Sequence, residues 1–120
     1  MRHVVNGALG IDTQARKFDC HVAAKLGDQG SVVCEAGGTA VYRVPIFHVP
    51  VVDTTGAGDA YCGGFLAGLV GGRTVQECAA MGTVSASYVV EARGGLATGR
   101  PKPDERNSRL ASVISRIERG

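Results

Sequence analysis

The spacing of apolar positions divides the chain into a β-rich first half and a helical second half. Three stretches have the apolar character of strands, and they are Cys20–Leu26, Ser31–Glu35 and Thr39–Val44. We expect the first of these strands to be buried. The turn-rich tetrad Gly27–Gly30 separates the first two strands, so we expect the chain to reverse its direction there. Gly37-Gly38 makes the second turn. Residues 46–52, with Pro45 and Pro50, continue as extended chain of edge or turn character.

A helical pattern follows from residue 58 onward. Bulky apolar residues at positions 61, 65, 66 and 69 have the spacing of one helix face, and Gly71-Gly72 ends the pattern. Gly63, Gly64 and Gly68 each cost such a helix about 1 kcal/mol relative to alanine. We therefore expect another backbone to lie close against them and the helix to be buried.

Two further helices are indicated by their ends. Thr74 and Glu77 form a Thr-x-x-Glu capping box, which predicts a helix running towards Val90 that stops at Gly94-Gly95. Asp104 is the expected cap of a last helix, after the Pro101-Lys-Pro103 break. One face of that helix is an apolar stripe formed by Leu110, Val113, Ile114 and Ile117. The opposite face is charged and carries Arg106, Arg109, Arg116 and Glu118. One α/β unit results, preceded by a poorly readable segment over residues 1–19.

Composition limits the classes of function. With 120 residues, of which 44% are hydrophobic, the chain can bury one modest core. Its 13 basic and 11 acidic residues form no long basic run outside Arg100, Lys102 and Arg106, so charge does not suggest nucleic acid. The sequence shows no apolar stretch long enough to span a bilayer and no secretory pattern. We expect no membrane association and a cytoplasmic location.

The cysteines and histidines do not form a recognisable metal motif. Cys20, Cys34, Cys62 and Cys78 include no Cys-x-x-Cys pair, and the three histidines are not spaced as zinc ligands. Reduced, buried thiols are therefore expected.

Gly56-Ala57-Gly58 and Asp59 carry the clearest chemical signal. If a helix begins at this point, the small residues expose consecutive N–H groups at its positive end and form an anion hole. An adjacent carboxylate could accept a proton from a hydroxyl group that attacks a phosphoryl group. The alternative is an ordinary strand-to-helix junction with an acid that suits the helix dipole.

The run Asp53–Leu66 resembles the C-terminal signature of the ribokinase-like (PfkB) carbohydrate kinase family, without a mismatch. The resemblance implies the C-terminal part of a three-layer α/β fold, with residues 20–120 as its nucleotide-binding and catalytic part. It implies Asp59 as catalytic base and the N–H groups of Gly56, Ala57 and Gly58 as anion hole. The reaction would be phosphoryl transfer from ATP, with Mg²⁺, to a small sugar or nucleoside.

The resemblance extends to other segments. Lys25–Ser31 is similar to the family turn whose glycines, here Gly27 and Gly30, lie beside the ATP phosphates and ribose, with Lys25 where threonine is common. A plain hairpin turn is the alternative. Asp53 and Thr55 correspond to residues that hold a monovalent cation such as K⁺, together with a loop similar to residues 91–95. Asp53 could instead cap the turn through an Asx hydrogen bond.

The second predicted helix lies where the family packs against adenine. Met81, Val84 and Ala86 could contact the base, although residues of this kind are more often ordinary core residues.

Family members are longer, and the Asn-x-x-Glu motif associated with magnesium is absent, because neither Asn6 nor Asn107 is followed by glutamate at that spacing. Two functions therefore remain open: a kinase lobe, or a truncated, non-catalytic nucleotide-binding domain. An unrelated α/β domain with a coincidental glycine turn is the third alternative. We expect exposed apolar surface and sheet edges to favour self-association.

Overall fold

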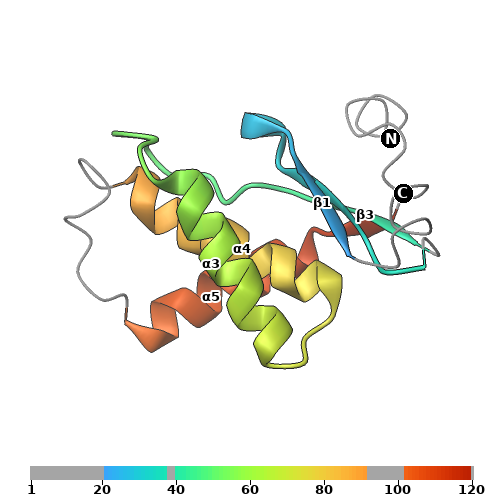
Figure 1. Ribbon diagram of the computed structural model, residues 1–120. Helices are drawn as coiled ribbons and strands as arrows, with labels where there is room; N and C mark the ends of the chain where they lie inside the picture. Colours follow the sequence, from blue (N-terminus) through green and yellow to red (C-terminus); the bar gives the residue numbers. More distant parts are fainter. Residues whose placement is uncertain (1–20, 38–39, 92–101, 120) are drawn as a thin grey trace.

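The computed structural model describes residues 21–37, 40–91 and 102–119. Its elements in chain order are β1 (Val22–Lys25), the 3₁₀ turn η1 (Gly27–Gln29), β2 (Ser31–Cys34), β3 (Val41–Val44), α3 (Ala57–Val70), α4 (Val75–Val90), α5 (Pro103–Ser115) and β4 (Glu118–Arg119). The β-rich first half and the three helices are therefore confirmed (Figure 1). The segment 1–19 and the predicted stop at Gly94-Gly95 lie outside the described residues.

The four strands form one antiparallel sheet in the order β1-β2-β3-β4. β2 is buried along its whole length, but β1 alternates between half-buried and exposed positions. The prediction that β1 is buried was wrong, because β1 pairs only with β2 and lies at the sheet edge. β4 was not predicted: Glu118 was assigned to the last predicted helix, but that helix ends at Ser115 and Glu118 pairs with β3 instead. Residues 46–51 belong to no helix or strand.

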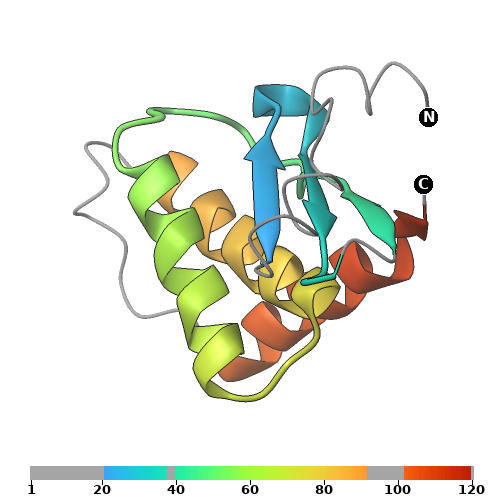
Figure 2. The same cartoon turned by 45° about the vertical axis from the view of Figure 1, so that its right-hand side comes forward.

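The main core lies between the sheet and the helices, which pack on one face of it (Figure 2). Val33 and Val44 of the sheet meet Val75 and Ala79 of α4 and Val113 of α5, and all five are fully buried. Val32 and Cys34 point to the opposite face of β2, where they form a second small cluster. The described residues thus form a sheet layer and a helix layer.

α3 and α4 pack so closely that their backbones almost touch. A Cβ atom on Gly64 would lie 2.6 Å from the Met81 carbonyl oxygen, and one on Gly68 would lie 2.8 Å from Cys78 Sγ. From the other helix, a Cβ on Gly82 would lie 2.7 Å from the Tyr61 carbonyl oxygen. The expected close backbone is confirmed for Gly64 and Gly68.

The same contact leaves the outer side of α3 uncovered. A Cβ atom on Gly63 would meet no neighbour within 4 Å, and the side chains of Leu66 and Val70 are 58% and 90% exposed. The predictions that α3 is buried and that Gly63 needs a close neighbour were therefore wrong. The two buried residues of α3, Tyr61 and Gly68, lie on the side that meets α4. None of the described helices combines the length and apolar character needed to cross a bilayer.

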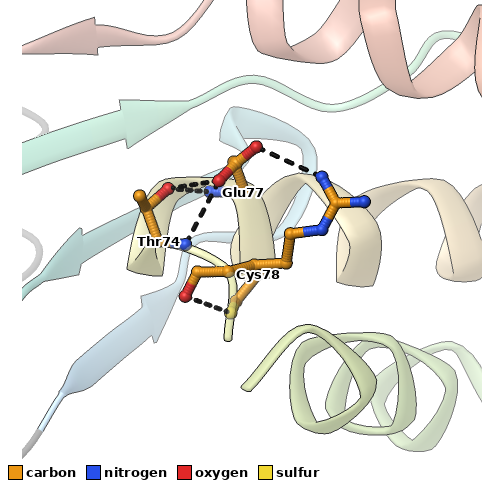
Figure 3. Close-up of polar contacts among 4 residues, drawn as sticks. Thr74, Glu77 and Cys78 are labelled. Carbon is orange, nitrogen blue, oxygen red and sulfur yellow. Dashed lines mark hydrogen bonds and ion pairs between the residues drawn. The ribbon is translucent and has the colours of Figure 1, made fainter. Parts of the chain in front are cut away.

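The predicted capping box at the start of α4 is confirmed. Thr74 Oγ1 accepts a hydrogen bond from the Glu77 N–H at 3.3 Å, and Glu77 Oε1 accepts one from the Thr74 N–H at 3.2 Å (Figure 3). These bonds, with a smaller effect of Arg73, hold the pKa of Glu77 below its ordinary value. Burial raises the pKa of the adjacent Cys78 thiol. Cys34 and Cys78 are buried as expected, whereas Cys62 is exposed, which corrects that prediction.

α5 begins two residues earlier than predicted. Pro103 occupies its first position, Lys102 is the N-cap, and no side chain caps the helix, so the prediction of Asp104 as cap was wrong. Proline suits that position because its φ angle is already helical and its missing N–H would have no partner. The apolar stripe is confirmed in part: Val113 is fully buried, whereas Ile114 is 37% exposed and Ile117 lies beyond the helix, which ends at Ser115.

The sequence pattern placed Arg109 on the charged outer face of α5, but Arg109 does not lie there. It is 9% exposed, because it lies one turn before Val113 and so shares the buried face. Its guanidinium lies 3.9 Å from the centre of the Tyr88 ring, forms ion pairs with Glu91 and Glu105, and donates a hydrogen bond to Ser87 Oγ. Arg109 therefore joins α5 to the C-terminal half of α4.

We predict opposite effects for two neighbouring glycines of α3. Gly64→Ala should lower the free energy of unfolding by about 1–3 kcal/mol, because its methyl group would overlap the α4 backbone. Gly63→Ala should raise it by up to about 1 kcal/mol, because helix propensity improves where space is open. Urea unfolding of both variants measures these changes, and equal effects would contradict the packing described above.

We also predict that Arg109→Met lowers the free energy of unfolding by about 2 kcal/mol or more. A loss of ~3–5 kcal/mol is typical of a broken buried pair, and the loss here should fall near or below the lower end of that range because both glutamates keep partial contact with water. Arg106→Met is the matched control, since Arg106 is exposed on the same helix and should change stability by less than about 0.5 kcal/mol. Similar losses in the two variants would show that Arg109 does not join the helices.

Candidate active site

A cavity of about 510 Å³ lies where the β1–β2 turn, the β3–α3 connection, the start of α3 and the C-terminal half of α4 meet. Its lining includes residues from all four segments, and these are Lys25, Gly27, Asp28, Gly30, Ser31, Ile46, Phe47, His48, Val49, Val51, Thr54, Ala57, Gly58, Tyr61, Thr83, Ala86, Ser87 and Val90. A cavity of this volume, largely apolar with a few polar groups, is typical of small-molecule sites.

The β1–β2 turn places two of the predicted residues at the cavity. The Leu26 N–H donates to the Gly30 carbonyl at 2.8 Å, and the Gly30 N–H donates to the Gly27 carbonyl at 3.2 Å. Gly30 has φ +87°, and a Cβ there would lie 2.2 Å from the Val44 carbonyl oxygen. The glycine is thus required by the hairpin itself, and the same conformation brings its backbone to the cavity wall.

The turn before α3 is held by its own polar groups. Asp53 Oδ1 accepts hydrogen bonds from the Thr55 N–H at 2.9 Å and from Thr55 Oγ1 at 2.7 Å, which is an Asx arrangement. Gly56 then takes φ +83° as the N-cap residue of α3. The N–H groups of Val52 and Asp53 donate to the Val90 carbonyl at 2.7 and 3.2 Å, so the connection is fixed to the end of α4.

The start of α3 points N–H groups towards the cavity. The Ala57 N–H donates to the Thr54 carbonyl at 3.1 Å, so an anion would have to share it. Gly58 is the second residue of the helix, where a backbone N–H has no acceptor within the helix, and it lines the cavity. The helix dipole adds positive potential at the same place. Gly58 is therefore the best-placed donor for an anion.

Asp59 is exposed in the first turn of α3 and does not line the cavity. Successive helix residues point about 100° apart, so Gly58 and Asp59 address different sides of the same turn. The structure thus brings Gly27, Gly30, Ala57 and Gly58 to one cavity, whereas Gly56, Asp59, Asp53 and Thr55 lie at its margin outside the lining.

Sequence reasoning did not identify Tyr61 as a residue of the site. Tyr61 is 8% exposed, and its hydroxyl group donates to Ser31 Oγ at 3.1 Å. Burial raises its pKa, against a smaller lowering by that hydrogen bond, so the hydroxyl stays protonated at neutral pH. Lys25 Nζ lies 5.7 Å from the centre of the same ring. The helical spacing between Gly58 and Tyr61 was the signal that could have found this residue.

The α4 wall of the cavity follows one helix face, formed by Thr83, Ala86, Ser87 and Val90. Of the residues considered as base contacts, only Ala86 lines the cavity. Val84 is 3% exposed in the main core, and the backbone of Met81 contacts α3. Val84 is therefore an ordinary core residue, whereas Met81 lies where α4 packs against α3.

The described residues contain no group of three or more histidine, cysteine, aspartate or glutamate side chains that could hold a metal ion. Asp53 and Thr55 could contribute oxygen atoms to a cation only together with further oxygen ligands. Of the loop predicted to supply them, residues 91–95, all but Glu91 lie outside the described residues.

Comparison with known proteins places this arrangement in a family. The profile of the pfkB family carbohydrate kinases matches residues 10–103. The nucleoside kinase of Methanocaldococcus jannaschii is 36% identical over 110 residues, which are 91% of this chain and 33% of that protein. The chain spans about a third of the length of the curated relatives it matches.

Solved structures agree. A crystal structure of a Methanocaldococcus jannaschii nucleoside kinase, an archaeal member of the ribokinase family, has a TM-score of 0.66 at 33% identity and covers 77% of this chain and 30% of its own. An Arabidopsis thaliana ribokinase complexed with ribose and ATP has a TM-score of 0.65 at 31% identity, over 75% of this chain and 28% of its own. The described elements thus form part of the ribokinase fold, and the chain belongs to the pfkB family of carbohydrate kinases.

Proposed function

We propose that this chain binds ATP in the 510 Å³ cavity and supplies the phosphoryl-transfer end of a sugar or nucleoside kinase. The supporting observation is that Gly58, at the start of α3, and the Gly27–Gly30 turn line the same cavity in a member of a kinase family. The α4 face with Thr83 and Ala86 offers a surface for the adenine base.

In the proposed reaction, each of these groups has a distinct role. The acceptor hydroxyl attacks the γ-phosphorus atom of ATP, its proton passes to the Asp59 carboxylate, and the bond between the γ-phosphorus and the β,γ-bridging oxygen breaks to release ADP. The N–H groups of Gly56, Ala57 and Gly58 stabilise the negative charge on the moving group. Asp59 lies on another side of the turn from the cavity, which suits an acceptor that approaches from outside the nucleotide site.

Two cations belong to this proposal. Mg²⁺ commonly binds to substrate phosphates with few protein ligands, and it would neutralise charge on the ATP phosphates here. A monovalent cation such as K⁺ would lie near Asp53 and Thr55, where it would hold the turn that precedes the anion hole. The Asx hydrogen bonds already shape this turn, so the cation would add to an ordered loop.

The second candidate function is a non-catalytic nucleotide-binding domain. It is favoured by the exposure of Asp59, with no other described acid beside it in the first turn of α3. Exposed apolar side chains on α3, including Leu66 and Val70, would then favour self-association or a partner that completes the site.

ATP with Mg²⁺ should raise the melting temperature of the purified chain. At a concentration of about 100 times Kd the stabilisation is about 2.7 kcal/mol. Gly58→Val should reduce this shift because its side chain would occupy the anion hole, and Gly63→Val, on the open side of the same helix, should not. A folded chain whose melting temperature does not respond to ATP would refute nucleotide binding.

Asp59→Asn should lower phosphoryl transfer by about 100-fold or more while the Kd for ATP stays unchanged, because the amide cannot accept the proton. The assay is ADP release with a panel of pentoses, hexoses and nucleosides. Turnover retained in the variant would remove Asp59 from the role of base. ATP binding without transfer in the unsubstituted chain would favour the non-catalytic domain.

A further inference from the structure

Lys25 places a positive charge beside the first turn of α3. It is the last residue of β1, it pairs with Ser31 of β2, and its side chain lines the cavity. Its Nζ atom would lie 3.2 Å from a Cβ atom on Gly58. The ammonium group is therefore next to the backbone that the proposed function assigns to the anion hole.

The surroundings hold this ammonium group without neutralising it. Lys25 Nζ lies 5.7 Å from the centre of the Tyr61 ring, and the Tyr61 hydroxyl is itself tied to Ser31, the residue opposite Lys25. A cation over an aromatic face is attracted to it. Within the described ranges, no carboxylate forms an ion pair with Lys25.

The ammonium group of Lys25, which is exposed to solvent, and the start of α3 both attract anions. Helix N-termini carry partial positive charge, so an anion that lies between the two gains both attractions. Gly58 has no side chain, which leaves room for such an anion, and lysine acts as a point charge for phosphate groups elsewhere.

We propose that Lys25 binds the nucleotide phosphate that rests against Gly58 and that Tyr61 positions the ammonium group for it. This assignment rests on the proposed function, since it takes the nucleotide to be the occupant of the cavity. It gives Lys25 a direct phosphate contact at the position where threonine is common in the family. The Tyr61 ring limits the freedom of the lysine side chain, so less entropy is lost when phosphate binds.

Titration calorimetry with Mg²⁺-ATP and with adenosine tests this role. Lys25→Met, which keeps the side-chain length without the charge, should raise the Kd for ATP by about 10- to 100-fold and leave the Kd for adenosine unchanged. Lys25→Arg should restore ATP binding to within about threefold, since it keeps the charge. Lys102→Met is the matched control, because Lys102 is exposed at the start of α5 and should change neither Kd.

A second readout separates charge from packing. The Kd of the unsubstituted chain for ATP should rise with salt more steeply than that of Lys25→Met, because one cation–phosphate contact is lost in the variant. Melting temperatures without ligand verify that the variants fold.

Two results would overturn the assignment while the proposed function stands: equal ATP affinity in Lys25→Met and the unsubstituted chain, or an equal loss for ATP and adenosine. The second result would make Lys25 only a brace on Tyr61. If the unsubstituted, folded chain fails to bind ATP, the proposed function fails, and the assignment of Lys25 fails with it.

Discussion

The close backbone contact between α3 and α4 determines where the parts of the candidate site lie. Gly64, Gly68 and Gly82 remove the side chains that would separate the two helices. α4 also packs on the sheet through Val75 and Ala79, so it carries α3 with it into a defined position. The start of α3 consequently faces the β1–β2 turn, and the cavity is the space that this geometry leaves open.

Features that depend on local chemistry could be predicted from the sequence. The Thr74–Glu77 capping box, the glycine turn after β1 and the start of α3 each follow from a few adjacent residues. Features that depend on neighbours distant in sequence could not. The exposure of β1 follows from its place at the sheet edge, and the burial of Arg109 depends on the Phe47 and Tyr88 rings and on Glu91, none of which lies on α5.

The candidate site also contains parts that could be predicted from adjacent residues and parts that could not. The run Asp53–Leu66 indicated the anion hole, because its glycines and acid are contiguous. Lys25, Ser31 and Tyr61 come from three elements, and only the packing of β1, β2 and α3 brings them together. That Asp59 lies outside the cavity was also not evident, since a linear motif does not state which side of a helix turn each residue faces.

Because Gly68 and Cys78 are in contact, the reactivity of Cys78 can be used to measure how often α3 and α4 separate. Cys78 Sγ is enclosed between α3 and α4, whereas Cys62 on α3 is exposed. An alkylating reagent can reach Cys78 only when the helices separate, and the raised pKa of this thiol slows its reaction further. The ratio of the two alkylation rates therefore measures how often the interface opens, and a ligand bound across α3 and α4 would slow the labelling of Cys78 without altering that of Cys62.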